Sequence, residues 1–321
     1  MKRFQQIVKV LLSAGIIMFL VILVWQRRDE LAPIYQHPSL NLLLLAFLII
    51  LGHFLNSAEF WVVYRATDIN IGFFENWMVF TSGLLGNLLP GQMGSVYKFR
   101  YMKAVHKLSY TKSGSNYGAN LIISLGSSAI VGLIGVFGNA ATGHSFSVIM
   151  LLCFIGLGFV FFFSLRLTLP DWKFLRGKPA RIVGTFAEGW NEIRRLPRAI
   201  VKVLVIDIGK YLLTAWRFQI AFGLLGYHQS FWYFLVIATS AGIAGIITFT
   251  PGGLGIRELF ITGAAVAMGS SFNIGLLAAT TDRGILLASS VVLGGIGFLY
   301  SLPRIRAARS ESPESEESSL N

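Results

Sequence analysis

Charged residues are scarce in this sequence. Of its 321 residues only 13% are Asp, Glu, Lys or Arg, whereas 54% are hydrophobic. Soluble domains contain about 25% charged residues, so an ordinary soluble domain is excluded and a multi-pass membrane protein is indicated. Acids are especially few, with 15 Asp and Glu against 27 Lys and Arg. Because Lys and Arg collect in the cytoplasmic loops of membrane proteins, this surplus of positive charge does not require a nucleic acid partner.

Cysteine is almost absent. The single cysteine, Cys153, excludes an intramolecular disulfide, a C-x-x-C redox pair and a Cys-based zinc site. It lies in an apolar run, where we expect it to be packed. The five histidines form no H-E-x-x-H zinc motif. The sequence therefore predicts no cofactor and no metal, and it favours a transporter-like protein over an enzyme.

Long apolar runs are abundant. A helix needs about 20 mostly apolar residues to cross the bilayer, and six runs of the sequence are long enough. The run nearest the N-terminus is followed by Arg27 and Arg28 rather than by a small-residue cleavage site, so we expect it to be retained. The six predicted transmembrane helices are 7–25, 40–64, 118–138, 148–166, 203–223 and 283–302.

Two further apolar segments, 76–110 and 232–270, are interrupted by Pro-Gly clusters. Proline removes a helical hydrogen bond, and glycine permits a sharp reversal of the chain. Each segment is therefore predicted to be a re-entrant helical hairpin, which enters and leaves the membrane on one side. The predicted turn residues are Pro90, Gly91 and Gly94 in the first hairpin, and Pro251, Gly252, Gly253 and Gly255 in the second.

The distribution of Lys and Arg predicts the topology. Basic residues outnumber acids at both ends of the apolar body, in 97–112, which has no acid, and in 166–202, which has nine Lys and Arg against three acids. The positive-inside rule places these four regions in the cytoplasm, so both termini are predicted to be cytoplasmic. This arrangement is satisfied when the two hairpins open to opposite sides of the membrane.

The two hairpins also suggest an internal repeat. Their P-G-x-x-G motifs lie 161 residues apart, from Pro90 to Pro251, and the same offset places 40–64 and 118–138 on two later predicted spans. The sequence therefore predicts an all-α integral membrane protein whose two halves form an inverted repeat, as in many transporters. The alternative is that P-G-x-x-G recurs by chance among 34 glycines. The predicted parts are 1–39 (first helix and outer loop), 40–138 (first repeat), 139–202 (one span and a basic interfacial segment), 203–303 (second repeat) and 304–321 (a disordered acidic tail).

Charged residues inside a span are costly and are functional candidates by default. The span 203–223 places Asp207, Lys210 and Arg217 on one helical stripe. Asp207 and Lys210 either neutralise each other or belong to a site. Arg217 has no acid close to it on its helix, and a planar guanidinium suits a phosphate or carboxylate. The 161-residue offset pairs Arg217 with Asn56.

The second hairpin adds further candidates. A helix that restarts after Pro-Gly exposes unpaired N–H groups to anions, and Arg257 and Glu258 follow at this point. Arg257 is expected to bind a lipid phosphate, while Glu258 either pairs with Arg257 or caps the helix. The hairpin glycines either let a headgroup approach the backbone or serve only close packing. The predicted headgroup-binding residues are Arg217, Arg257, Glu258, Lys210 and Asn56.

The two hairpin motifs resemble a known family. Leu88 to Val96 is similar to its L-L-P-G-R-x-G-E element, and Thr250 to Glu258 is similar to its T-P-G-G-L-G-x-R-E element. The family is the lysylphosphatidylglycerol synthase transmembrane region, the flippase-like module of the multiple peptide resistance factor, whose members also occur alone beside envelope-glycan genes. Gln92 and Ser95 replace the usual Arg and Glu of the first element, so a charge pair is lost there. No part of the sequence resembles the aminoacyltransferase domain, so lysine transfer from tRNA is not expected.

The resemblance implies a protein of a bacterial or archaeal inner membrane that handles an anionic phospholipid or a polyprenyl-phosphate lipid in cell-envelope biogenesis. Two alternatives stay open. One is an enzyme or subunit that supports glycosyl transfer from a polyprenyl-phosphate sugar, for which the sequence offers Asp29, Glu30 and Asp282 as outward-facing carboxylates. The other is a non-transporting scaffold for envelope-biosynthesis enzymes, compatible with the basic aromatic segment 166–202 and the polar tail.

Overall fold

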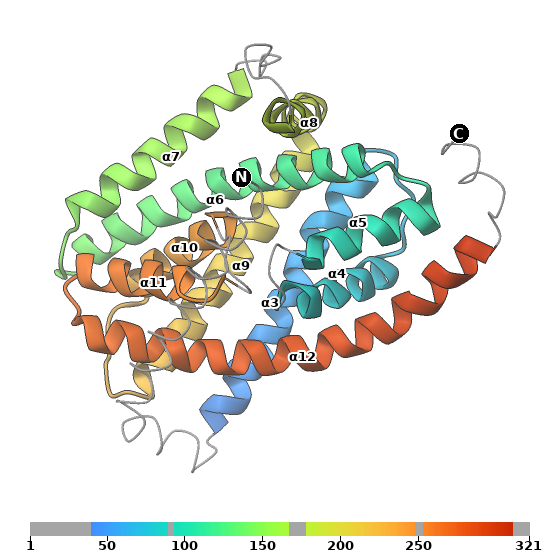
Figure 1. The fold of residues 1–321 in the computed structure, drawn as a ribbon. Helices are drawn as coiled ribbons and strands as arrows, with labels where there is room; N and C mark the ends of the chain where they lie inside the picture. The colour runs from blue at the N-terminus through green and yellow to red at the C-terminus, as the bar shows by residue number, and fades with distance from the viewer. Residues whose placement is uncertain (1–39, 89–92, 167–177, 248–252, 311–321) are drawn as a thin grey trace, which may run out of the picture. The chain divides into compact units, whose positions relative to one another are not determined.

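A computed structural model of the chain describes residues 40–88, 93–166, 178–247 and 253–310. Every element in these ranges is an α-helix (Figure 1), as the apolar composition predicts. In chain order the helices are α3 (Leu40–Ala66), α4 (Phe73–Asn87), α5 (Met93–His106), α6 (Tyr110–Ala141), α7 (Val148–Arg166), α8 (Lys178–Ile193), α9 (Pro197–Gly223), α10 (Phe231–Ile247), α11 (Ile256–Ala267) and α12 (Phe272–Ser310).

Four of the described helices, α3, α6, α7 and α12, are long and apolar enough to cross a membrane. They contain the predicted spans 40–64, 118–138, 148–166 and 283–302. The predicted span 203–223 is helical within α9, but Asp207, Lys210 and Arg217 make α9 too polar to belong to this group. The predicted span 7–25 lies outside the described residues, so the count of six stays a prediction.

Both interrupted segments break where the Pro-Gly clusters lie. The first segment forms α4 and α5, and the second forms α10 and α11; in each pair the two helices pack against each other. Pro90, Gly91, Pro251 and Gly252 themselves lie outside the described residues. One order of helices occurs twice, from α3 to α6 and from α9 to α12: a long helix is followed by two short helices and then by another long helix. Re-entrance of the two pairs and the inverted orientation of the halves stay predictions.

The chain divides into two compact units. The α10–α11 unit contains described residues 40–56, 121–166, 204–247 and 253–289, and the α4–α5 unit contains 57–88, 93–120, 178–203 and 290–310. Neither unit coincides with a predicted repeat, because residues of 40–138 and of 203–303 occur in both.

The core of the α10–α11 unit surrounds α10. The consecutive residues Tyr233 to Ala238 are all buried, and they pack with Phe218 and Phe222 of α9. Gly132 of α6 leaves room for the ring of Phe154 on α7, where a Cβ atom would overlap that ring. Helix α10 is therefore enclosed on all sides, which explains why it is almost uniformly apolar.

Close contact between helices characterises the α4–α5 unit. A Cβ on Gly94 of α5 would overlap the Gly83 carbonyl oxygen of α4. Gly297 of α12 similarly approaches the Met78 carbonyl. These glycines let helix backbones approach within a distance that no larger residue allows.

Two expectations need correction. Cys153, expected to be packed, is exposed on α7, whose outward face is apolar over most of its length. In addition, α12 continues to Ser310, so the first residues of the predicted tail 304–321 are helical. The reason is that Ile305 is buried in a core with Tyr64 and Tyr101, which extends the helix beyond the apolar run. Residues 311–321 lie outside the described ranges.

Candidate functional site: a buried arginine cluster

Three helices of the α10–α11 unit bring five charged side chains together. We call them the arginine cluster: Arg217 of α9, Arg257 and Glu258 of α11, and Asp282 and Arg283 of α12. Arg217, Glu258, Asp282 and Arg283 are buried, and the Arg257 side chain is only 16% exposed. Charged side chains are almost never this buried unless they are paired, so their partners define the site.

Asp282 is the carboxylate shared by two arginines. Its Oδ2 accepts a hydrogen bond of 3.0 Å from Nη2 of Arg217. Its Oδ1 lies 2.5 Å from Nε of Arg217, although this second contact lacks hydrogen-bond geometry and counts only as an ion pair. Nη2 of Arg257 lies 3.6 Å from Oδ2. That distance is too long for a hydrogen bond, so Arg257 forms no hydrogen bond with any described residue.

Glu258 links the cluster to the start of α11. One carboxylate oxygen, Oε2, accepts a hydrogen bond of 2.7 Å from the backbone N–H of Gly255, and Oε1 lies 3.5 Å from Nε of Arg283. Of the two predicted roles, Glu258 therefore has the capping role, and its ion-pair partner is Arg283. Gly253 and Gly255 have φ values of 71° and 86°, which glycine adopts at no steric cost.

Arg257 is the most weakly held cation of the cluster. Asp282 contacts two guanidiniums but accepts a hydrogen bond from Arg217 alone, so the charge of Arg257 is met only by the contact of 3.6 Å. A buried charge that lacks a partner is costly. The arrangement can therefore stabilise one additional anionic group, and Arg257 has the free hydrogen-bond donors to receive it.

His53 of α3 adds an unsatisfied polar atom to the same unit. It is 8% exposed, and its Nε2 is buried without a hydrogen-bond partner in the described structure. Asn56, one turn along α3, is less available because its side-chain amide donates to the Gly52 carbonyl of its own helix. Asn56 corresponds to Arg217 in the predicted repeat, but no hydrogen bond joins the two side chains in the described structure.

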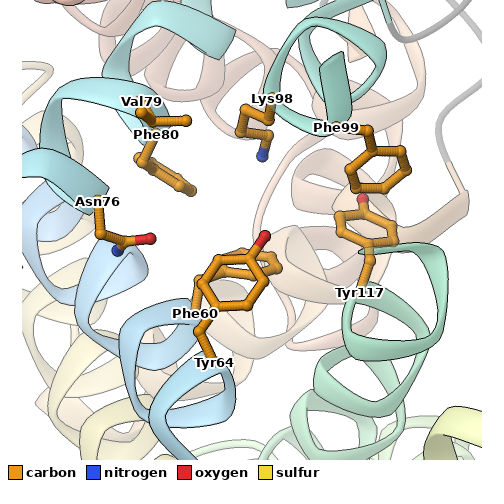
Figure 2. A pocket seen from close by; sticks show the side chains of 8 residues that line it. All are labelled: Phe60, Tyr64, Asn76, Val79, Phe80, Lys98, Phe99 and Tyr117. Atoms are coloured by element: carbon orange, nitrogen blue, oxygen red, sulfur yellow. The ribbon is translucent and has the colours of Figure 1, made fainter. Parts of the chain in front are cut away.

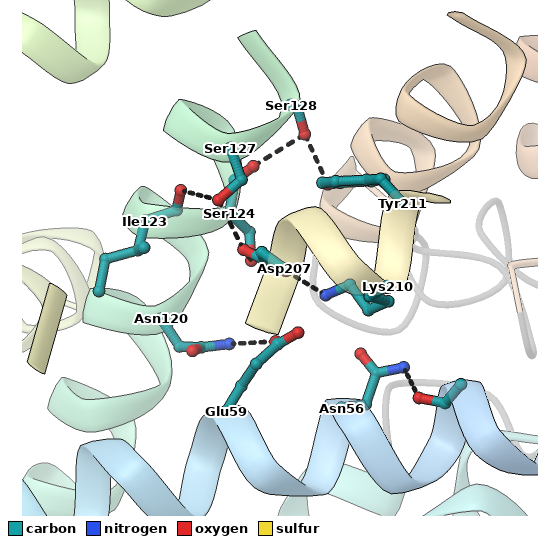
Figure 3. Close-up of polar contacts among 11 residues, drawn as sticks. Asn56, Glu59, Asn120, Ile123, Ser124, Ser127, Ser128, Asp207, Lys210 and Tyr211 are labelled. Carbon is teal, nitrogen blue, oxygen red and sulfur yellow. Dashed lines mark hydrogen bonds and ion pairs between the residues drawn. The ribbon is translucent and has the colours of Figure 1, made fainter. Parts of the chain in front are cut away.

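Lys210 belongs to a different group of side chains. Figure 3 shows Lys210 paired with Asp207 on the same helix, while Ser124 and Ser127 of α6 each donate a hydrogen bond of 2.9 Å to Asp207. Asp207 is fully buried. Asp207 and Lys210 therefore neutralise each other, which was one of the two alternatives predicted for them. The carboxylate of Asp207 is compensated by three polar side chains, those of Lys210, Ser124 and Ser127.

The α4–α5 pair contains a cation whose neighbours are aromatic rings rather than acids. Lys98 of α5 points into a narrow pocket of the α4–α5 unit (Figure 2). Its ammonium lies 5.0 Å from the ring centre of Phe60, 4.8 Å from Phe80 and 5.9 Å from Tyr117. Aromatic faces attract a cation by cation–π interaction, so three rings surround this half-buried lysine where a carboxylate would ordinarily pair with it.

Sequence reasoning missed two members of the arginine cluster. Arg283 was not singled out, and Asp282 was considered only as an outward-facing carboxylate, whereas it is 1% exposed and paired with two arginines. The adjacent acidic and basic residues at the edge of the span 283–302 were the available signal. Gly94, a predicted turn residue, lies within α5 and serves close packing.

The part of the chain that the structure describes is helical, and four of its helices are long and apolar enough to cross a membrane, which defines a multi-pass membrane protein. A family model described as the lysylphosphatidylglycerol synthase TM region matches residues 6–294. The match covers most of the chain, and the protein belongs to this family, as the hairpin motifs indicated. No curated protein matches the chain.

Proposed function

We propose that this protein moves an anionic lipid across the membrane, with the lipid headgroup held at the arginine cluster. The candidate lipids are an anionic phospholipid and a polyprenyl-phosphate-linked intermediate of the cell envelope. The observation that carries the proposal is Arg257, whose side chain is only 16% exposed and forms no hydrogen bond with a described residue, beside the buried Arg217 and Asp282. The family name supports it, since lysylphosphatidylglycerol is a membrane lipid.

A phosphate suits this cluster for two reasons. Its oxygens match the fork of N–H donors on a guanidinium, which binds phosphate at two points. Its negative charge would also pair with the guanidinium of Arg257, which forms no hydrogen bond with a described residue, and electrostatic attraction is strong where water is excluded. Arg217 is held by Asp282, so Arg257 is the residue that we assign to direct contact with the headgroup.

The proposed movement follows from the two broken helix pairs. Transporters with broken helices bind substrate near the middle of the bilayer and expose the site to each side in turn. In our proposal the headgroup crosses along the polar residues while the acyl or prenyl chains stay in the bilayer. An anion that binds one exposed state more tightly than the other shifts their populations.

The experiment is a scrambling assay in liposomes. Headgroup-labelled phosphatidylglycerol, or a labelled polyprenyl phosphate, is placed in both leaflets and then quenched chemically from outside. We expect the wild type to expose label from the inner leaflet, Arg257→Gln to abolish this exposure, and Arg257→Lys to restore part of it, because lysine keeps the charge but lacks the fork.

The matched control is Arg306→Gln, which removes the same charge from an exposed position outside the cluster. It should scramble as the wild type does. If the wild type exposes only the outer leaflet for every lipid tried, the transport proposal fails, and the glycosyl-transfer and scaffold alternatives gain support. If Arg257→Gln folds and scrambles normally, the assignment of the site is wrong.

A further inference from the structure

The α4–α5 unit contains a second cationic feature, separate from both the arginine cluster and Lys98. A cavity of about 500 Å³ lies beside the end of α3 and the start of α9. This volume is within the usual range of small-molecule sites, about 300–1,000 Å³. Four of the ten lining residues are basic and none is acidic: Arg65, Arg195, Arg198 and Lys202.

These four cations have no acidic partners. None of them forms an ion pair with an acid in the described ranges, and the one polar contact among them joins Nη1 of Arg65 to the side-chain oxygen of Asn70 at 2.5 Å. Glu192, the nearest acid along the chain to Arg195, is paired with Lys112 instead. Four unpaired charges around one cavity repel one another, and a multiply charged anion would relieve that repulsion.

The start of α9 adds to the positive potential of the cavity. Leu196, Pro197, Arg198 and Ala199 line the cavity, and α9 begins at Pro197. The first turn of a helix carries the positive end of the helix dipole, which adds to the charge of the side chains.

Part of the cavity lining is apolar. Trp61, Val62 and Leu196 contribute to it, and the Trp61 ring is fixed because its Nε1–H donates a hydrogen bond of 3.0 Å to the Ile71 carbonyl. The cavity therefore offers both charged and apolar contacts. That combination suits an amphiphile, and basic pockets beside membrane helices bind lipid headgroups that carry more than one phosphate.

We propose that this cavity binds an anion with two phosphate groups. Four cations exceed what a single phosphodiester needs, and the volume admits two phosphates. Two kinds of ligand carry such a pair of phosphates: a membrane lipid with two phosphates and a soluble diphosphate. The site is independent of the transport proposal, since it uses none of the residues of the arginine cluster.

The test compares two probes on the full-length protein in detergent. Native mass spectrometry measures binding of tetraoleoyl cardiolipin, which has two phosphates, against dioleoyl phosphatidylglycerol, which has one. Titration calorimetry measures binding of inorganic pyrophosphate, the soluble probe. The pocket variant is Arg195→Gln/Arg198→Gln. The control is Arg100→Gln/Arg306→Gln, which removes two exposed cations of the same unit from outside the cavity.

We expect the wild type to prefer cardiolipin, the pocket variant to lose about tenfold in affinity, and the control to match the wild type. Pyrophosphate binding that depends on Arg195 and Arg198, with no preference for cardiolipin, assigns the site to a soluble diphosphate and supports the same chemistry. Equal binding by the pocket variant and the wild type, or an equal loss in the control, overturns the proposal. Arg195→Lys/Arg198→Lys, which keeps both charges, should retain most of the affinity and so separates loss of charge from loss of fold.

Discussion

Arg217 and Asp282 stand 65 residues apart in the chain, yet the guanidinium of one contacts both carboxylate oxygens of the other. Both side chains are buried. Their pairing joins α9 to α12 and provides the fixed part of the arginine cluster, on which Arg257 depends for its position near Asp282.

Replacement of Asp282 by Asn tests the importance of this pair. The variant leaves the buried Arg217 without its carboxylate partner, and removal of one partner of a buried ion pair costs about 3–5 kcal/mol. We expect a loss of this size in the free energy of unfolding, measured by denaturation in mixed micelles. Arg217→Gln/Asp282→Asn should lose less than the sum of the two single variants, because neither charge is then left alone.

Glu192→Gln is the control for that cycle. Glu192 pairs with Lys112, but its side chain is 41% exposed, and exposed pairs contribute about 0–1 kcal/mol. A loss at Asp282 no larger than the loss at Glu192 would contradict the buried pairing.

Two substitutions at Glu258 separate its capping of α11 from its ion pair with Arg283. Glu258→Gln keeps an oxygen that can accept from the Gly255 N–H but removes the charge that faces Arg283, whereas Glu258→Ala removes both. Loss of a helix cap costs about 0.5–2 kcal/mol, so the Ala variant should unfold at a lower temperature than the Gln variant. Equal unfolding temperatures would show that the cap has no stabilising effect here.

Gly94→Ala should be strongly destabilising. Its new methyl group would overlap the Gly83 carbonyl oxygen and the Asn87 side chain, and overpacking typically costs about 1–3 kcal/mol. Gly209→Ala in α9 is the matched control, because nothing lies within 4 Å of its added methyl. That control should be neutral or more stable, since Ala favours a helix by about 1 kcal/mol over Gly. Both are measured by thermal unfolding.

Lys98→Met tests the aromatic pocket. Methionine keeps an unbranched side chain among Phe60, Phe80 and Tyr117 but removes the half-buried charge. Replacement of buried charge by a well-packed apolar group is often stabilising by about 1–4 kcal/mol, while the lost cation–π contacts offset about 0.5–2 kcal/mol. We therefore expect a modest rise in unfolding temperature. A fall would mean that the three rings stabilise the ammonium more than burial penalises it.

Local features of the fold were predictable from the sequence, and long-range partners were not. The two helix breaks were predicted from the Pro-Gly clusters, because proline has no backbone N–H and removes a helical hydrogen bond; the described helices end before these clusters and begin again after them. The pairing of Lys210 with Asp207 was foreseen as one alternative, since three residues on a helix bring side chains together. The pairing of Arg217 with Asp282 was not foreseen, because helical spacing gives no information about which residue of α12 will face α9.

The division into compact units is a separate matter from the predicted repeat. A repeat search compares residues at a fixed offset, and its two consecutive halves stay a prediction. The compact units combine separated stretches of chain, such as 40–56 with 204–247. Packing between distant segments decides that grouping, and a single sequence records hydrophobicity but not which segments meet.

Cys153 gives this chain a built-in attachment point. It is the one cysteine of the sequence, and it is exposed on the apolar face of α7. A spin label or fluorophore reactive toward thiols therefore modifies a single known position in the unaltered protein. From that position, quenchers placed at graded depths in the acyl chains report how deeply α7 sits in a bilayer.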